Sequence, residues 1–530
     1  AVIVPIFNPP LDMLVECVES VRGQTAKHWQ LLLSDDGSTD ESVCRYLDSL
    51  AESTRDDDRI SVIRSANGGI AQACNRGLEH VRTSYFGWLD HDDRLNPRAI
   101  ELFSAALAEQ AARAEPALVI YSDEDKIDVH GRHFELYCKP DYSPELLMTQ
   151  MYLCHFTAFR TDRVRSIGGF RSTMDGAQDF DLALRLLEPS TIQPAPVVLH
   201  VSRPLYHWRA WAQSTAASID AKPWAQEASA RAQQEHLDRS FGGGSVERSR
   251  VPGLNAVHPR VGHGGAPPTV SVIIPTIGTI DPVRGGRFVD HAVQSLRTRQ
   301  DMRGIEIIAV TTGVIDPIAG VDRQIEHHPV TFNFATAINV GRENSTGEYL
   351  LLLNDDTLVA DDEPVTRLLE LGQIPGVGIV GAKLTYPDGR LQHVGIVLLP
   401  SGPTHPFITR SGRDPGYFGS TLTPRNTSAV TAAAMLVRTS VFDEVHGFDP
   451  TFARDFNDVD FCLRVGALGH RVAWTPYAHF THCEGASLTR RKPNVDEAAE
   501  FDRRWHDALG ADPYYSPRLN DLLARIYEAC

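Results

Sequence analysis

Three carboxylates follow an apolar segment near residue 90 and could hold a divalent cation. In Trp88-Leu-Asp90-His-Asp92-Asp93 they fall within four positions. Such crowding is unfavourable unless a cation or a basic partner offsets it, and carboxylate oxygens suit Mg²⁺ or Mn²⁺. Taken alone, a solvated acidic loop is an equally good interpretation of this cluster.

The second half of the chain repeats this pattern, which favours the metal interpretation. Tyr85 to Asp93 aligns without a gap with Tyr349 to Thr357, an offset of 349 − 85 = 264. Asn354-Asp355-Asp356 therefore stands where the first half has Asp90-His91-Asp92. Further matches at the same offset are Ala71, Ala73, Asn75 and Gly77 with Ala335, Ala337, Asn339 and Gly341. We therefore expect two related domains in tandem.

Three other segments of the first half carry candidate functional groups. Leu31-Leu-Leu-Ser-Asp35-Asp36-Gly37 runs an apolar segment into two carboxylates that could bind a nucleobase or ribose, although an Asp-Gly turn with a helix cap is the alternative. Asp179 follows a Gly-rich loop at the start of a predicted helix and could act as a general base, or merely cap that helix. His207 could complete a metal shell and Arg209 could hold phosphate, or both could be structural.

Composition narrows the class of protein. The chain has 530 residues, 42% of them hydrophobic and 22% charged, as expected for a globular protein of two or more domains. Its formal net charge of −17 argues against nucleic acid as a partner. Eight scattered cysteines without a CxxC pair predict reduced thiols. No apolar run is long enough to cross a bilayer, and the start at Ala1 rather than Met suggests that N-terminal residues are missing.

Short apolar segments alternate with helical patterns, which predicts an α/β fold with mainly parallel sheets. Expected strands include 31–33, 86–89, 118–121, 270–275, 305–310 and 349–353, and expected helices include 11–22 and 98–109. Residues 241–268 are rich in Gly and Pro and predict a linker between domains at 1–240 and 269–530, with an ordered strap as the alternative. Each domain should be a doubly wound sheet, whose ligands bind at the carboxyl ends of the strands.

The order of these motifs resembles family 2 glycosyltransferases with the GT-A fold. The segments that carry the resemblance in the first half are Val4-Pro5-Ile-Phe-Asn8, Asp35-Asp36-Gly-Ser, Asp90-x-Asp92-Asp93, and Gly168-Gly169-Phe170 followed by Gln178-Asp179. The second half resembles bacterial rhamnosyl- or related polysaccharide glycosyltransferases. Its segments are Val272-Ile-Ile-Pro275, Asn354-Asp355-Asp356, Tyr386-Pro-Asp-Gly, Gly447-Phe448-Asp449, Asn457-Asp458-Val-Asp460 and His479-Phe-Thr-His482.

The resemblance implies metal-dependent, inverting transfer of a sugar from a nucleotide diphosphate donor to a glycan hydroxyl. The implied bases that deprotonate the acceptor are Asp179 and Asp458. The implied ligands of Mn²⁺ or Mg²⁺ are Asp92, His207, Asp356 and His482. The implied donor contacts are Pro5, Asp35, Asp36, Asp90, Arg209, Pro275, Asn354 and Asp355.

One departure affects the second half: Thr311-Thr312 replaces the acidic pair Asp35-Asp36. An active second site is favoured, because Asp356, Asp458 and His482 persist. The alternative is a second domain that serves as a non-catalytic glycan-binding or scaffold module.

Two further expectations concern rival activities and location. A nucleotidyltransferase is disfavoured because no Gly-rich basic phosphate loop opens either domain. We expect a cytoplasmic protein acting on a surface polysaccharide or a lipid-linked glycan, with peripheral contact at the inner face of the membrane if the acceptor is lipid-linked.

Overall fold

The computed structural model describes residues 1–112, 115–188, 196–211, 223–249, 251, 253–329, 331–483 and 494–519. The chain divides into two compact units. The first is built mainly from Ala1–Ser240 and Ser245–Val257, and the second from Phe241–Gly244 and His258–Pro517.

The first unit is a sheet covered by helices on both faces. Its strands are β1 (Val2–Ile6), β2 (Leu31–Asp35), β3 (Ile60–Arg64), β4 (Tyr85–Trp88), β5 (Arg94–Leu95), β6 (Val119–Ile127), β7 (His133–Tyr137), β8 (Thr157–Arg160) and β9 (Val198–Arg209). Its helices are α1 (Leu11–Arg22), α2 (Glu41–Ser53), α3 (Ile70–His80), α4 (Ala99–Ala111), α5 (Pro144–Leu147), α6 (Thr161–Ser166), α7 (Gln178–Leu186) and α8 (Pro223–Phe241). The strand order is β3-β2-β1-β4-β8-β6-β9-β5, with β7 paired to β6.

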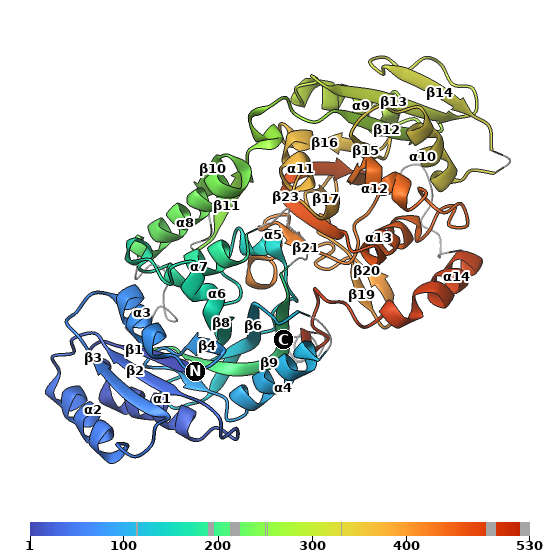
Figure 1. The fold of residues 1–530 in the computed structure, drawn as a ribbon. Helices are drawn as coiled ribbons and strands as arrows, with labels where there is room; N and C mark the ends of the chain where they lie inside the picture. The colour runs from blue at the N-terminus through green and yellow to red at the C-terminus, as the bar shows by residue number, and fades with distance from the viewer. Residues whose placement is uncertain are drawn as a thin grey trace. The chain divides into compact units, whose positions relative to one another are not determined.

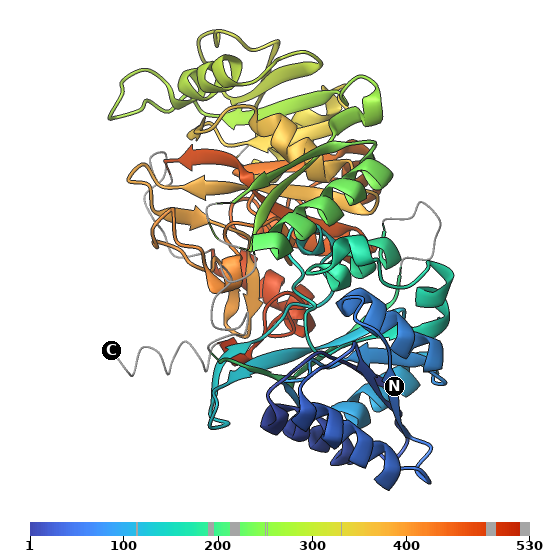
Figure 2. The same ribbon diagram turned by 90° about the vertical axis from the view of Figure 1, so that its left-hand side faces the viewer.

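The amphipathic helices follow from the spacing of their apolar residues. In α1 the buried residues Leu14, Cys17, Val18 and Val21 recur at helical spacing. The strands β1 and β2 are buried at every position, as expected for parallel strands covered on both faces. In Figure 1, α3 lies on one face of β1 and β2, and α1 and α2 lie on the other, a placement that Figure 2 repeats from the side.

The second unit repeats this architecture. Its strands are β12 (Val270–Thr276), β13 (Ile305–Thr312), β14 (Arg323–His327), β15 (Tyr349–Leu353), β16 (Thr357–Val359), β17 (Val377–Thr385), β18 (Leu391–His393), β19 (Val397–Leu399), β20 (Gly402–Thr404), β21 (Arg425–Asn426), β22 (Ala434–Arg438) and β23 (Arg471–His482). Its helices are α9 (Phe288–Arg299), α10 (Phe334–Glu343), α11 (Pro364–Gly372), α12 (Thr439–Glu444), α13 (Asn457–Ala467) and α14 (Val495–Trp505).

The strand order of the second sheet, β14-β13-β12-β15-β22-β17-β23-β16 with β18 on β17, matches that of the first position by position. The predicted fold class, two tandem domains of mainly parallel sheet flanked by helices, is confirmed. One strand in the middle of each sheet, β8 or β22, runs antiparallel to its neighbours.

Residues of the predicted repeat make the same contacts in both units. The Asn75 side chain exchanges two hydrogen bonds with the backbone of Phe170, at 2.8 and 2.9 Å, and Asn339 does the same with Phe448, at 2.9 and 3.0 Å. Each asparagine therefore ties the helix after the third strand to the Gly-Gly-Phe or His-Gly-Phe loop that leads toward the predicted base.

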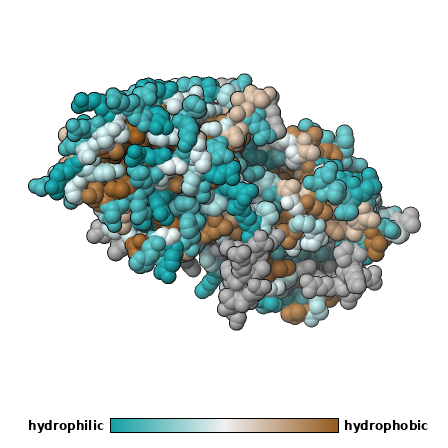
Figure 3. Space-filling view, turned by 90° about the horizontal axis from the view of Figure 1, so that it is seen from below, coloured by the Kyte–Doolittle hydropathy of each residue, from teal (hydrophilic) through white to brown (hydrophobic). Residues whose placement is uncertain are grey.

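The segment 241–268, predicted as a linker, holds regular structure in part. Gly244–Arg248 forms β10 and Asn255–Pro259 forms β11, and these two strands pair with each other. None of the helices in the described part of the chain is both long and apolar enough to cross a membrane. Hydrophilic side chains cover most of the face drawn in Figure 3, and the hydrophobic ones lie among them in small groups.

Candidate active sites

In the first unit, the predicted donor-binding carboxylates lie at the carboxyl ends of neighbouring parallel strands. Asp35 ends β2, Asp36 follows it, and Asp90 follows β4, while β1 lies between these two strands. Ligands of open α/β sheets bind at this edge, where the strand order reverses. The fold therefore brings together residues that are more than fifty positions apart.

Asp36 is buried and accepts several hydrogen bonds. Its carboxylate accepts hydrogen bonds from the backbone N–H groups of Gly68, at 2.9 Å, and Gly69, at 2.8 Å, and forms an ion pair with Arg76 of α3. Asp35 accepts from the Ser38 N–H at 3.1 Å. Nothing in the sequence linked Arg76 to Asp36, because the two side chains meet only when α3 packs on the sheet.

The three carboxylates after β4 have different surroundings. Asp93 is buried, and it accepts hydrogen bonds from the Tyr206 hydroxyl at 2.5 Å and from the Arg209 N–H at 2.7 Å. Burial, together with the charges of Asp92 and Asp90, raises the pKa of Asp93 well above its usual value. Asp93 therefore fixes the loop, whereas Asp90 and Asp92 are only partly buried and remain accessible to a ligand.

Asp92 is oriented by two side chains near the end of β9. The Trp211 indole donates to the Asp92 carboxylate at 2.7 Å, and the Arg209 guanidinium donates to the Asp92 carbonyl at 2.7 Å. Arg209 is buried and also pairs with Glu16 at 2.6 Å. The Pro5 carbonyl lies 3.1 Å from Nδ1 of His91, the residue between Asp90 and Asp92.

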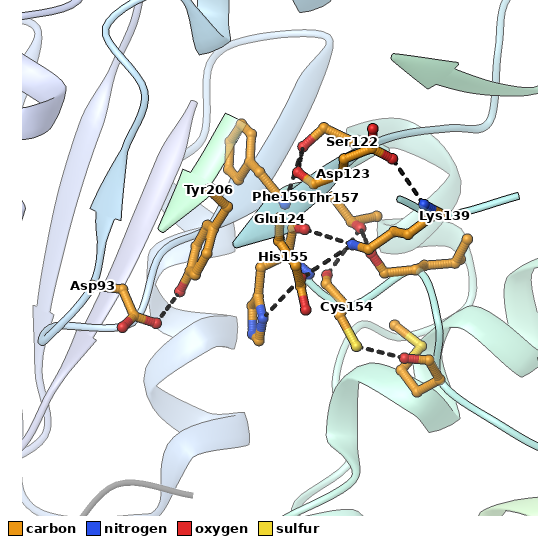
Figure 4. A network of polar contacts seen from close by, with 12 residues as sticks. Asp93, Ser122, Asp123, Glu124, Lys139, Cys154, His155, Phe156, Thr157 and Tyr206 are labelled. Atoms are coloured by element: carbon orange, nitrogen blue, oxygen red, sulfur yellow. Dashed lines mark hydrogen bonds and ion pairs between the residues drawn. The ribbon is translucent and has the colours of Figure 1, made fainter. Parts of the chain in front are cut away.

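A histidine that the sequence analysis did not single out lies near the Asp-x-Asp segment. Nε2 of His155 lies 3.8 Å from the Asp90 carboxylate, and its ring stacks on Tyr206 with centroids 4.5 Å apart. Figure 4 shows its surroundings: Glu124 accepts the His155 backbone N–H at 3.1 Å and pairs with the buried Lys139, also at 3.1 Å. Lys139 in turn donates to the carbonyls of Leu153 and His155, each at 2.7 Å.

Asp179 lies in the first turn of α7, where the helix dipole favours a negative charge. Its pKa is nevertheless raised above the ordinary aspartate value, first by desolvation and also by the charge of Asp90, while His155 opposes the shift. A carboxylate with a raised pKa beside a partly exposed Asp-x-Asp segment is a suitable general base.

The second unit brings together the corresponding predicted residues, but the side chains around its Asn-Asp-Asp segment differ. Nε2 of His482 lies 3.1 Å from Oδ1 of Asp356, and Nδ1 of the same ring contacts the Gln392 side chain at 2.9 Å. Asp355 accepts from the Thr276 hydroxyl at 2.6 Å, and burial raises its pKa to about 6. Pro275, in β12, pairs with Val310 of β13, as Pro5 pairs with Ser34.

The predicted base of the second unit is linked to its Asn-Asp-Asp segment through the backbone. Asp458 accepts from the Ala432 N–H at 3.3 Å, and the next carbonyl, Ala433, accepts the Asn354 N–H at 3.1 Å. Desolvation raises the pKa of Asp458, and His405 opposes the shift. His405 contacts His393 with 3.0 Å between their Nδ1 atoms, so a pair of imidazoles lies near this base.

The strand register shows which residues of the second unit stand in place of Asp35 and Asp36. Thr311, near the end of β13, pairs with Thr276 of β12, just as Asp35 of β2 pairs with Ile6 of β1, so Thr311 occupies the position of Asp35. The Thr311 hydroxyl donates to the Gly313 carbonyl at 3.1 Å. The position equivalent to Asp36 is therefore Thr312, which carries no charge.

Strand register defines equivalent positions in the two sheets. Gly87 pairs with Ala158, which pairs with Ile120 on β6. Leu351, 351 − 87 = 264 positions after Gly87, pairs with Leu436, which pairs with Val380 on β17. Ile120 and Val380 are therefore equivalent.

The two histidines predicted as metal ligands are not equivalent. Asp125 lies five positions after Ile120 and pairs with His207 on β9. Thr385 lies five positions after Val380 and pairs with Thr481 on β23. The equivalent of His482 is thus Trp208, one residue beyond His207. Because side chains alternate along a strand, His207 and His482 point to opposite faces of their sheets. His207 contacts Asp125, with 2.6 Å from its Nδ1 to the carboxylate.

Comparison with known proteins identifies the chain's family. Residues 1–168 match the family model "Glycosyl transferase family 2". The chain is 32% identical over 537 residues to "O-antigen biosynthesis protein RfbC" of Myxococcus xanthus, covering 98% of this chain and 40% of that protein. Residues 1–168 belong to glycosyltransferase family 2.

Two other relatives match the chain over different lengths. "Uncharacterized protein y4gI" of Sinorhizobium fredii is 38% identical over 541 residues, covering 98% of this chain and 57% of that protein. "Chondroitin synthase" of Escherichia coli is 32% identical over 189 residues, covering 36% of this chain and 26% of that protein. The chain spans about half the length of the first two of these relatives. The family resemblance predicted from the motifs is confirmed.

Proposed function

We propose that this glycosyltransferase carries two active sites, one in each unit, and transfers sugars from nucleotide diphosphate donors to a growing glycan. The observation that carries the proposal is the repeated geometry: in both units an Asp-x-Asp or Asn-Asp-Asp segment follows a central strand, and an aspartate stands in the first turn of a helix. Asp179 is influenced by the charge of Asp90, and Asp458 is connected to Asn354 through hydrogen bonds to the backbone of Ala432 and Ala433. The similarity to a protein named for O-antigen biosynthesis and to a chondroitin synthase supports a polysaccharide or lipid-linked acceptor.

The proposed chemistry is a single displacement at the anomeric carbon. The bond between the acceptor oxygen and that carbon forms, the bond to the diphosphate oxygen breaks, and the acceptor proton passes to Asp179 or Asp458. With the base and the leaving diphosphate on opposite sides of the sugar, the configuration would be inverted. By analogy with glycoside hydrolysis, positive charge builds up on the sugar in the transition state.

The donor is held by groups at the carboxyl ends of the strands. In the first unit, Asp36 with Asp35 would contact the base, and Asp90 the ribose or sugar. In the second unit Thr312 lacks that charge, so we expect different or weaker recognition of the base there. The two sites would therefore use different donors.

The residues in both units fit a divalent cation, which when bound would neutralise charge on the leaving diphosphate. In the second unit, Asp356 and His482 present an oxygen and a nitrogen 3.1 Å apart, a set that suits Mn²⁺. In the first unit, Asp92 with Asp90 presents oxygens only, which suits Mg²⁺ or Mn²⁺.

Replacing His482 by Ala should raise the Mn²⁺ concentration needed at the second site by at least about tenfold, because it removes a nitrogen ligand beside Asp356. The measurement is release of nucleoside diphosphate as a function of Mn²⁺ with the donor used by that site. His479→Ala is the matched control, because His479 lies on the same strand but contacts Asp361 and Thr385. An equal Mn²⁺ requirement in both variants would remove His482 from the ion-binding set.

The pH dependence of transfer should reflect the raised pKa of the two bases. Each carboxyl works in its ionised form, and its pKa lies above the ordinary 3.8. Transfer should therefore fall, as pH decreases, at a higher pH than an ordinary aspartate would give. The measurement is kcat/KM against pH for each donor; a profile that stays flat down to pH values near 3.8 would contradict a base in a desolvated site.

A further inference from the structure

Three side chains of the first unit, outside its Asp-x-Asp segment, form a second cluster of metal-binding groups. Asp125 on β6 pairs directly with His207 on β9, and His133, which opens β7, pairs with Ile127. Since side chains alternate along a strand, residues two apart share a face, and directly opposed residues do too. The antiparallel pairing of β6 with β7 and the parallel pairing of β6 with β9 therefore place the side chains of Asp125, His133 and His207 on one face of the sheet.

The distances among these groups approach those of a coordination shell. Nδ1 of His207 lies 2.6 Å from one oxygen of Asp125, and Nδ1 of His133 lies 2.9 Å from the other. All three ligand atoms lie within 4.8 Å of one another, and the two rings stand at 85° with centroids 4.7 Å apart. In a tetrahedral zinc site, ligand atoms about 2.0–2.1 Å from the ion are about 3.3 Å apart. An entering ion would therefore spread the two Asp125–imidazole pairs by less than an ångström, while the two imidazole nitrogens already lie within 4.8 Å of each other.

The charges and exposure of the cluster also suit a cation. Asp125 and His207 are buried, while the His133 side chain is 51% exposed and leaves a route for an ion and water. One carboxylate faces two imidazoles, so with neutral rings the cluster carries a single negative charge. The basic residues next to Asp125 and His133 in sequence are paired with other carboxylates: Lys126, which alternates to the opposite face, with Glu135 at 2.6 Å, and Arg132 with Asp128 at 2.7 Å.

The second unit provides an internal comparison. Its positions equivalent to Asp125 and His207 are Thr385 and Thr481, and Thr385 contacts His479 at 2.9 Å. A hydroxyl is a poor ligand for a transition metal beside imidazole and carboxylate. The cluster is thus a feature of the first unit and is not part of the repeated donor-binding geometry.

We propose that Asp125, His133 and His207 bind one transition metal ion of the Zn²⁺ type, with water completing a four-coordinate shell. Two imidazoles and one carboxylate are a set found in zinc sites that keep an open position. The ion would fasten the β6–β7 hairpin to β9 next to Tyr206, whose hydroxyl holds Asp93. This site is independent of the proposed sugar transfer and of the ion on the diphosphate.

The test is calorimetric titration of the metal-free full chain with Zn²⁺ alone, without nucleotide, supported by the visible spectrum of bound Co²⁺. His133→Ala removes the exposed ligand and should weaken Zn²⁺ binding by more than the roughly 10- to 100-fold that loss of an outer-shell partner costs. His133→Cys should restore binding, because thiolate is also a zinc ligand. His130→Ala is the matched control, as His130 is an exposed histidine in the turn of the same hairpin.

Wild type, His130→Ala, Asp92→Ala and Asp356→Ala should each bind one Zn²⁺ at this site with the same affinity. Three results would overturn the proposal: no Zn²⁺ binding by the wild type, unchanged binding by His133→Ala, or loss of the site in Asp92→Ala instead. Circular dichroism of each variant separates loss of a ligand from loss of the fold.

Discussion

Transfer at the first site should fall by about 10²- to 10⁴-fold when Asp179 is replaced by Asn, the range that a general base supplies. The amide keeps the size and most of the hydrogen-bonding geometry but cannot accept the acceptor's proton. Donor binding should persist, because the donor contacts assigned to Asp36, Asp90 and Asp92 are untouched. The measurement is turnover of the first donor together with its dissociation constant.

Asp458→Asn is the matched variant, because it removes the same group from the same position of the other unit. It should leave the first reaction intact and lower the second by a similar factor. Full activity of Asp179→Asn with the first donor would remove Asp179 from the role of base. An unchanged product profile in Asp458→Asn would indicate a silent second unit and favour a glycan-binding or scaffold role for it.

Replacing Lys139 by Met should lower the free energy of unfolding of the first unit by about 3–5 kcal/mol, the cost of breaking a buried ion pair. The ammonium group is fully buried and donates to Glu124 and to the carbonyls of Leu153 and His155. Without it, the buried Glu124 carboxyl loses its ammonium partner and the two carbonyls lose their donor. The measurement is equilibrium unfolding in urea of the variant and the wild type.

Lys126→Met is the control for this prediction. Lys126 is nearby on β6, but its pair with Glu135 is partly exposed, and such pairs contribute about 0–1 kcal/mol. Equal stability losses in Lys126→Met and Lys139→Met would contradict a dominant role for burial. Because His155 depends on Lys139 for its backbone position, the surviving folded fraction of Lys139→Met should also turn over the first donor more slowly.

The fold could be predicted from the sequence because its signals are local and repeated. The predicted helix 11–22 coincides with α1, and the expected strands at 31–33 and 86–89 lie in β2 and at β4. The gap-free repeat at an offset of 264 indicated two units of one architecture, and the strand orders agree. Periodicity and duplication need no knowledge of contacts between distant segments.

The partners of the candidate site residues could not be predicted, because they depend on long-range packing. Arg76 meets Asp36 only when α3 lies on the sheet, and nothing near His155 in the sequence indicates that it faces Asp90. The different positions of His207 and His482 follow from how β9 and β23 align with their neighbours. The register between β6 and β9 shifts at Asp123, and irregularities of this kind have no clear sequence signal.

The central claim, two metal-dependent transfer sites in one chain, is tested most directly by release of free nucleoside diphosphate from a panel of nucleotide sugars, with Mn²⁺ or a chelator. Wild type, Asp92→Ala and Asp356→Ala would be compared in the presence of glycan acceptors. We expect chelator-sensitive release that Asp92→Ala loses for one donor and Asp356→Ala loses for another. Absence of release with every donor and acceptor, or loss of all release in either single variant, would contradict two independent active sites.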